Sequence, residues 1–215
     1  VDRLAVEKTI PVDQAAGHMV AVSADRGRAF VANIGDGTVS VLDLIAARKL
    51  TDLQAGEGSE GIALAGSGAE LWVSNRAAGT VSVFSTGDLG KIADLPLPGF
   101  PIRVEADDAR GLVYVTLPEA DALAVFDRER REERSRLQFD IPPDRSRRTL
   151  FGDMLPDSSI PIGVLLSGDG ETLFVAHSNA HVITVYDART LERRAIIATG
   201  VEPDGMGWSP RDVAL

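Results

Sequence analysis

Short apolar runs and polar turns alternate along the chain, and one such pattern occurs four times. Residues 30–43 read FVANIGDGTVSVLD, and the other copies are WVSNRAAGTVSVFS (72–85), YVTLPEADALAVFD (114–127) and FVAHSNAHVITVYD (174–187). In each copy an aromatic residue precedes a valine, an aliphatic residue follows eight positions after that valine, and a further valine stands two positions beyond. Two apolar runs joined by a short polar turn predict a β-hairpin.

Further apolar segments precede and follow each hairpin. Before the hairpins stand MVAVSADRG, GIALAGSG, RVEADDARG and GVLLSGDG, and segments such as RKLTDLQAG and RRAIIATG follow them. Each unit thus has four short strands, here named a to d, expected near residues 19–23, 28–34, 38–44 and 48–54 and again 42, 84 and 144 residues later. Four strands in about 42 residues are typical of a β-propeller blade. The predicted fold class is all-β: a propeller of four-stranded antiparallel blades, without a long helix.

The hairpin copies resemble the YVTN-repeat β-propellers, a family named for a tetrapeptide in strand b. That tetrapeptide appears here as FVAN, WVSN, YVTL and FVAH. The family's lead-in to strand a, a proline followed by a glycine, appears as Pro161 with Gly163 and as Pro203 with Gly205. It is partial elsewhere, because Gly61 lacks the proline and Pro101 is followed by Arg103 in place of the glycine. The resemblance covers almost the whole chain and is specific for the fold, but it is weak for activity.

The expected blade boundaries treat 1–215 as one propeller domain or propeller segment. Four whole blades are predicted, with an inserted loop at 144–160 and a partial blade at each end of the chain: 17–58, 59–100, 101–143 and 161–202, flanked by 1–16 and 203–215. Residues 1–12 align with 42–53, which predicts the tail of a strand c followed by a strand d, whereas 203–215 would supply only a strand a. Since the resemblance implies about seven blades, we expect a segment of a longer propeller that forms an open arc or borrows strands from elsewhere; the alternative is a compact five-bladed ring.

Connectivity predicts which loops share a face of such a propeller. The strands of a blade alternate in direction, so the d–a and b–c connections emerge on one face and the a–b and c–d connections on the other. His18, Glu60 and Asp204 occupy one repeat position just before strand a, at the mouth of the central channel, and Arg103 follows the same position in the third blade. We predict that these four residues bind a ligand; the alternative is that they only solvate the rim of the channel.

The insertion at 144–160 stretches one repeat from 42 to 60 residues and also joins a strand d to a strand a. A long insertion in a regular array is often a contact loop or lid. Its basic and apolar residues are predicted to contact a partner, although a solvated loop is the alternative: Arg145, Arg147, Arg148, Phe151 and Met154.

His177 and His181 flank the b–c turn of the fourth blade and are candidate metal ligands. Their spacing does not place both imidazoles on one side of a hairpin, and a third ligand is not evident. Asp43, Asp127 and Asp187 recur with the blades and are therefore interpreted as turn residues. The sequence has no nucleophile elbow, Walker loop or HExxH motif, so no catalytic residue is predicted.

The composition of the chain limits the kinds of partner that it can bind. With 22 basic and 32 acidic residues the formal charge is −10, and aromatic residues make up only 5% of the chain. An acidic, aromatic-poor protein is a poor candidate for nucleic-acid binding. No apolar run approaches the roughly 20 residues that a membrane helix needs. The chain has no cysteine, which excludes disulfides and thiolate metal sites.

We therefore predict a non-catalytic propeller that binds a protein or a small polar ligand through its d–a/b–c face, without a cofactor. The resemblance implies an exported protein in the periplasm, at the cell surface or secreted. Two alternatives stay open. One is an enzyme or redox subunit similar to quinoprotein amine dehydrogenases, haem d1 propellers or lactonases, in which the channel mouth would hold a quinone, haem, metal or substrate. The other is a structural repeat of a surface-layer or adhesion protein.

Overall fold

The computed structural model describes residues 5–209, which form four sheets of four antiparallel strands. The strands of each sheet pair in chain order, so each sheet is a four-stranded meander. The first two sheets are β1 (Gly17–Val22), β2 (Arg28–Asn33), β3 (Thr38–Asp43), β4 (Arg48–Gln54), β5 (Ser59–Ala65), β6 (Glu70–Asn75), β7 (Thr80–Ser85) and β8 (Lys91–Pro96). The last two are β9 (Val104–Asp107), β10 (Leu112–Leu117), β11 (Ala122–Asp127), β12 (Glu132–Gln138), β13 (Pro161–Leu166), β14 (Thr172–His177), β15 (Val182–Asp187) and β16 (Arg193–Ala198).

This architecture confirms the predicted β-propeller fold, and every strand lies within two residues of its expected bounds. The repeat includes an irregularity in strand pairing. The register shifts between strands c and d at the same point of every blade: after Val41, Val83, Val125 and Val185. No helix occurs within residues 5–209, so none there could cross a membrane.

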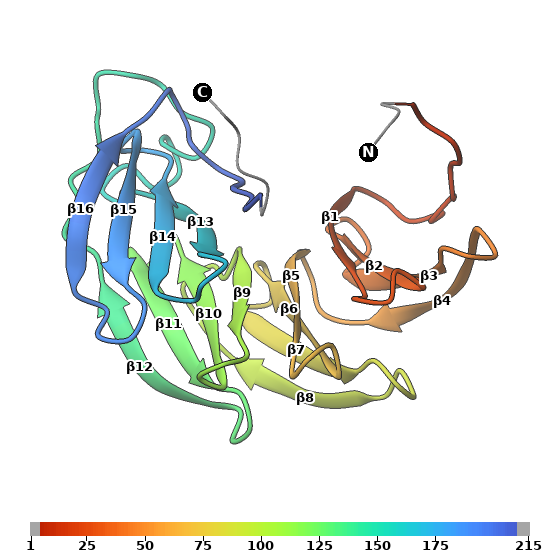
Figure 1. Cartoon of the computed structure of the whole chain (residues 1–215). Helices are drawn as coiled ribbons and strands as arrows, with labels where there is room; N and C mark the ends of the chain where they lie inside the picture. Colours follow the sequence, from red (N-terminus) through yellow and green to blue (C-terminus); the bar gives the residue numbers. More distant parts are fainter. Residues whose placement is uncertain (1–4, 210–215) are drawn as a thin grey trace.

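Successive sheets pack face to face, and the core lies between them (Figure 1). Trp72 of the second blade contacts the edge of Phe126 of the third, with ring centroids 5.9 Å apart, in a cluster that spans both sheets. Strand b is the most enclosed element, and every residue of β6 is buried. The same aromatic position is therefore a buried core position in the first three blades, at Phe30, Trp72 and Tyr114.

The described chain forms an open arc, with β1–β4 and β13–β16 at its two ends (Figure 1). Residues at the same repeat position differ in exposure between the ends and the middle of the arc. Ile197 of β16 is 48% exposed, whereas its equivalent Leu53 in β4 is 8% exposed because the next blade covers it. At the other end Val20 of β1 is 57% exposed, whereas its equivalent Ile62 is 7% exposed. Each end of the arc thus presents an apolar sheet face.

The strand segments expected at the ends of the chain are not formed in the described residues. Residues 5–16 contain no strand where a strand d was predicted, and 203–209 contain none where a strand a was predicted. A strand d needs the strand c of its own blade as a partner, and no such strand lies beside these residues in the described chain. Residues 1–4 and 210–215, which complete the two partial blades, lie outside the described residues.

Candidate functional site

The d–a connections and the b–c turns meet on one face of the arc. Arg76, in the turn after β6, contacts Glu60 at the start of β5. In the fourth blade the backbone N–H of Asp144, in the insertion, donates to the carbonyl of Asn179, in the turn after β14. We call this surface the d–a/b–c face.

Three of the four predicted ligand-binding residues form a chain of ion pairs on this face. Arg103 donates through Nη1 to Glu60 Oε1 and through Nη2 to Asp204 Oδ1, each at 2.8 Å. Glu60 Oε2 lies 2.7 Å from Nη1 of Arg76 without hydrogen-bond geometry. The fourth residue, His18, is at the edge of the group, with Nδ1 4.0 Å from Glu60 Oε1. We call these five residues the channel-mouth cluster.

The repeat explains why residues so distant in sequence meet here. Residues 60, 102, 162 and 204 hold equivalent positions before strand a, and the following residue is Gly61, Arg103, Gly163 or Gly205. A Cβ on Gly61 would lie 2.0 Å from the carbonyl oxygen of Ile102, and one on Gly163 would lie 2.1 Å from that of Asp204. The glycines are thus required where the next lead-in packs closely, and Asp204 occupies the lead-in position that follows the fourth blade.

Arg103 departs from this glycine pattern, and its departure creates the cluster. Its side chain is 8% exposed and connects Glu60 of the second blade with Asp204 beyond the fourth. Glu60 is almost as buried, at 6%, whereas the side chain of Asp204 is 51% exposed. A buried charge is tolerated only when it is paired, so the ion pair with Glu60 stabilises Arg103 in this buried position. The Nε–H of Arg103 is buried and has no hydrogen-bond acceptor among residues 5–209.

Sequence reasoning missed Arg76 and Phe100. An arginine in a polar b–c turn looks like an ordinary solvated charge, and only the folded chain brings it to Glu60. The guanidinium carbon of Arg76 lies 5.5 Å from the centre of the Phe100 ring, within reach of a cation–π contact. The sequence signal that was available is the d–a connector itself, in which Phe100 directly precedes the Pro101 lead-in.

The insertion lies beside the channel-mouth cluster and is connected to it through Phe100. Phe151 meets Phe100 edge to face, with ring centroids 6.3 Å apart. Both rings pack against a small apolar group formed by Ile102, Ile160 and Ile162. Since Phe100 also contacts Arg76, which pairs with Glu60, Phe100 connects the insertion with the channel-mouth cluster.

The charged residues of the insertion surround a hollow of about 380 Å³ on the same face. Arg145 pairs with Asp157, Arg148 pairs with Asp153 at 2.6 Å, and Arg147 also lines the hollow. Met154 is 64% exposed. The arginine side chains are well exposed, so the insertion offers a solvated basic surface rather than a buried site.

The end of the insertion has a structural role that the sequence did not reveal. Ser158 donates to the carbonyl of Pro118, and Ser159 donates to Asp121 Oδ1 at 2.5 Å. Both serines are buried, and burial raises the pKa of Asp121 although these hydrogen bonds oppose the shift. Residues 158–159 therefore belong to the scaffold, and only the earlier part of the insertion is a free loop.

The metal prediction for His177 and His181 is not supported by the geometry. His177 is fully buried, and both ring nitrogens are engaged at 2.8 Å, Nδ1 by Ser159 Oγ and Nε2 by Thr184 Oγ1. Burial lowers the pKa of His177 to about 3, so the imidazole is neutral. It stands where the first two blades have Asn33 and Asn75, whose side-chain amides donate to a strand-c serine, Ser40 or Ser82, at the repeat position that Thr184 holds in the fourth blade. His177 is a scaffold residue that replaces this asparagine.

The backbone conformation of His181 is that of its turn position in every blade. It has φ +55°, and Gly37, Gly79 and Asp121 hold the same repeat position with φ +63°, +62° and +48°. Its Nδ1 accepts a hydrogen bond from the backbone N–H of Glu202. Within residues 5–209 no three metal-binding side chains gather closely enough to hold an ion.

Glu105 is a half-buried acid that the sequence did not reveal. It lies on β9, and its Oε1 accepts the backbone N–H of Leu166 on the innermost strand of the next blade. Burial raises the pKa of Glu105 to about 7. Its hydrogen bond satisfies a backbone donor at the inner edge of β13, and this makes it a link between blades.

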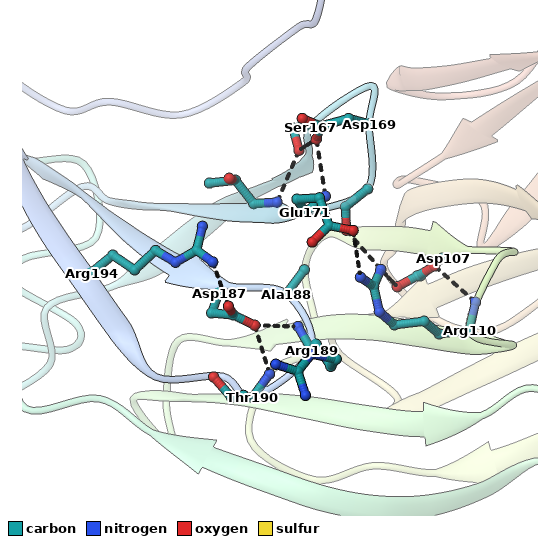
Figure 2. A network of polar contacts seen from close by, with 12 residues as sticks. Asp107, Arg110, Ser167, Asp169, Glu171, Asp187, Ala188, Arg189, Thr190 and Arg194 are labelled. Carbon is teal, nitrogen blue, oxygen red and sulfur yellow. Dashed lines mark hydrogen bonds and ion pairs between the residues drawn. The ribbon is translucent and has the colours of Figure 1, made fainter.

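The opposite face carries contacts of another kind (Figure 2). Arg110, in the a–b turn of the third blade, donates to Asp107 at 2.9 Å and to the carbonyl of Gly170 in the next a–b turn at 2.7 Å. Asp187 accepts the backbone N–H groups of Thr190 and Arg189, which lower its pKa to about 2, and it pairs with Arg194. Asp43 and Asp127 make equivalent turn contacts, as expected from their recurrence.

Comparisons with known proteins identify the fold and leave the family open. The sequence matches no protein-family model and no curated protein. Similar solved structures include a protein of unknown function from Desulfotomaculum acetoxidans DSM 771 (TM-score 0.67, 13% identity), the dihydro-heme d1 dehydrogenase NirN in complex with DHE (0.66, 18%) and Kuenenia stuttgartiensis hydrazine synthase (0.59, 14%).

The alignments cover 88%, 86% and 86% of this chain, respectively. They cover 58%, 38% and 75% of those chains, so this chain spans less than two thirds of the first two. At such low identity the likeness shows the propeller fold alone. Membership of the YVTN-repeat family stays a prediction.

Proposed function

We propose that this protein is a non-catalytic propeller that binds a small polar ligand, or a protein that presents one, at the channel mouth of its d–a/b–c face. One observation carries the proposal: the charged residues that break the repeat converge there. Glu60, Arg103 and Asp204 come from three different lead-ins and make direct contacts. Blades that repeat a scaffold need no such convergence, so these residues are the natural candidates for a site.

The insertion supports the same face. It packs Phe151 against Phe100 and displays Arg147 and two further arginines around a hollow next to the b–c turn of the fourth blade. A ligand at the channel mouth would therefore lie beside a loop that can contact either the ligand or the molecule that carries it.

A redox propeller is the second candidate, because NirN and hydrazine synthase are structural neighbours. A haem-type group needs an accessible axial ligand and apolar walls. Among the three histidines only His18 is exposed, and its side chain is 41% exposed beside Glu60. The residues grouped around Glu60 are charged, which suits a polar ligand better than a flat macrocycle, so the described residues fit this group poorly.

The test is a binding screen that compares the effect of substitutions on the two faces of the propeller. A panel of amino acids, small carboxylates, amines and sugar phosphates is screened against the wild-type protein by ligand-detected NMR. Each compound that binds is titrated against His18→Ala/Glu60→Gln and against Glu171→Gln, a matched change at an exposed acid of the opposite face. We expect a loss of affinity of about tenfold or more in the first variant only.

Two results would overturn the proposal. One is a panel in which no compound binds; the other is binding that survives the channel-mouth changes and is lost in Glu171→Gln. Thermal melting of each variant controls for folding. A protein partner is tested separately by changing Arg145, Arg147 and Arg148 to serine, which leaves the buried Ser158 and Ser159 in place.

A further inference from the structure

We infer that Arg103 is the receptor for the carboxylate of a small anionic ligand, and that Asp204 occupies this position as an exchangeable internal carboxylate. The inference rests on the proposed function, because it assigns a ligand class to the same channel mouth. It follows from how Arg103 is buried, which of its donors are used, and how Asp204 is held.

Arg103 is a buried cation with an unused donor. Its side chain is only 8% exposed, and its Nε–H has no acceptor in the described part of the chain. A buried unpaired donor costs free energy that a binding partner can recover. Buried donors are normally paired, so the open Nε–H points to an acceptor that residues 5–209 do not supply.

The pattern of occupied donors shows where that acceptor would bind. Nε–H and one N–H of Nη2 point in the same direction and form a two-donor fork that matches the two oxygens of a carboxylate. Asp204 uses only half of this fork, because one oxygen contacts Nη2 at 2.8 Å and Nε is left without a partner. A free carboxylate in the same place could accept from both nitrogens.

Asp204 does not make this second bond, and its backbone is held in place. Its carbonyl packs against Gly163, where even a Cβ would come within 2.1 Å, and the carbonyl of the preceding Pro203 accepts a hydrogen bond from Ser178 at 2.7 Å. The side chain, by contrast, is 51% exposed. The backbone is thus fixed while the carboxylate is free to leave Arg103 for water.

Charge selects the ligand class. Arg103 and Arg76 carry two positive charges, Glu60 is 6% exposed and remains as their permanent partner, and Asp204 supplies the second negative charge. A ligand carboxylate that replaces Asp204 leaves the local charge balanced, whereas a doubly charged phosphate would not. The site therefore favours a planar monoanion.

The experiment removes the internal competitor and adds acetate as the probe. Protein labelled with ¹⁵N is titrated with sodium acetate at constant ionic strength, with chloride as the balancing salt, and the arginine Nε–H resonances are followed. Arg103→Lys assigns the Arg103 signal by its disappearance. The proteins compared are the wild type, Asp204→Asn and Asp204→Ala.

The matched control is Asp157→Asn, which frees Arg145, an arginine whose side chain is 70% exposed, from an equivalent ion pair. We expect a saturable shift of the Arg103 Nε–H in both Asp204 variants, with acetate bound about tenfold or more tightly than in the wild type. Asp157→Asn should behave as the wild type. Inorganic phosphate, as a tetrahedral comparison, should bind more weakly than acetate.

Several results would overturn the inference. They are equal acetate affinity in the wild type and the Asp204 variants, a linear response in all proteins, or a response in Asp157→Asn as large as in Asp204→Asn. If both Asp204 variants failed to fold, Asp204 would be a structural residue and the exchange would be refuted. If this experiment failed while the ligand screen was positive, the proposed face would stay intact, because the panel also contains amines and sugar phosphates and reads binding through His18 and Glu60.

Discussion

The two faces of this propeller both carry ion pairs, but they are built differently. On the a–b/c–d face aspartate-capped turns recur at Asp43, Asp127 and Asp187, the last of which is drawn in Figure 2. The pairs between blades on this face, such as Arg131 with Glu70, join neighbouring blades. On the d–a/b–c face Glu60, Arg103 and Asp204 are unique to their blades and meet at one place.

The difference separates scaffold from site. A contact made inside every repeat stabilises the repeat, and its loss affects one turn. The pairs of Arg103 with Glu60 and Asp204, between residues 43 and 101 positions apart, bring three different lead-ins together at one place. We therefore expect changes at the channel mouth to have larger effects than chemically matched changes on the opposite face.

The largest expected effect is at Arg103. Arg103→Met leaves the buried Glu60 with Arg76 alone, and removal of one member of a buried pair costs about 3–5 kcal/mol of unfolding free energy. Arg194→Met breaks a half-exposed pair with Asp187 on the other face and should cost less than about 1 kcal/mol. Urea denaturation of both variants measures the contrast. Equal losses would remove the distinction between the faces, and Glu60→Gln added to Arg103→Met should recover part of the stability.

Glu105 lies in the contact between the third and fourth blades, away from both loop faces, and its ionisation can be tested there. Its pKa of about 7 lies above the ordinary 4.5, so the native state keeps a proton that the unfolded state loses, and stability falls as the pH rises from 4.5 to 7. Glu105→Gln should therefore stabilise the protein at pH 8, by up to about 3 kcal/mol, and have little effect at pH 4. Denaturation at both pH values checks this; a variant that is destabilised equally at both would show that burial does not disfavour the ionised acid.

His177 tests whether a residue on the d–a/b–c face belongs to the scaffold. The unfolded imidazole gains a proton below pH 6.5 and the buried one only near pH 3, so stability is complete above 6.5 and falls as the pH decreases. His177→Asn copies Asn33 and Asn75 and should remove this loss, which is about 2 kcal/mol at pH 5. The measurement is unfolding free energy at pH 7 and pH 5. Parallel losses in both proteins would mean that His177 is not held neutral.

The smallest expected effect concerns the link between the insertion and the cluster. Phe151→Ala removes the ring contact with Phe100, which adds about 0.5–1.5 kcal/mol to the packing of an aromatic pair. The Arg103 Nε–H resonance should also shift, because Phe100 contacts Arg76 next to Glu60. Met154→Ala, at an exposed residue of the same loop, is the control and should change neither quantity.

The strands could be predicted from the sequence because their signal is local. The apolar runs and turn residues recur at 42 residues, and a hairpin is specified by its own pattern of side chains and its turn. Even the position of the insertion followed from one interval of 60 residues. Residues 5–16, within the expected partial blade 1–16, form no strand for a related reason: the pattern of a strand is local, but its hydrogen bonds come from a neighbour, and the described chain supplies none there.

The candidate site was predicted in part. Connectivity placed His18, Glu60, Arg103 and Asp204 on one face, because alternating strand directions decide which connections share a face. The sequence could not reveal Arg76 or Phe100, nor that His177 is a buried substitute for Asn33 and Asn75. Burial and partners are properties of the packed chain, and the same residue type serves as solvated charge or buried ligand according to its surroundings.

The sequence by itself thus determined the repeat, the blade and the face on which the irregular residues gather, because these depend on period and direction along one chain. The tertiary structure alone decided that Arg103 is buried with one donor unused, that Asp204 stays half exposed, and that Ser159 and Thr184 occupy both nitrogens of His177. Those features depend on the distances between blades, and they are set only when successive sheets pack around a common centre.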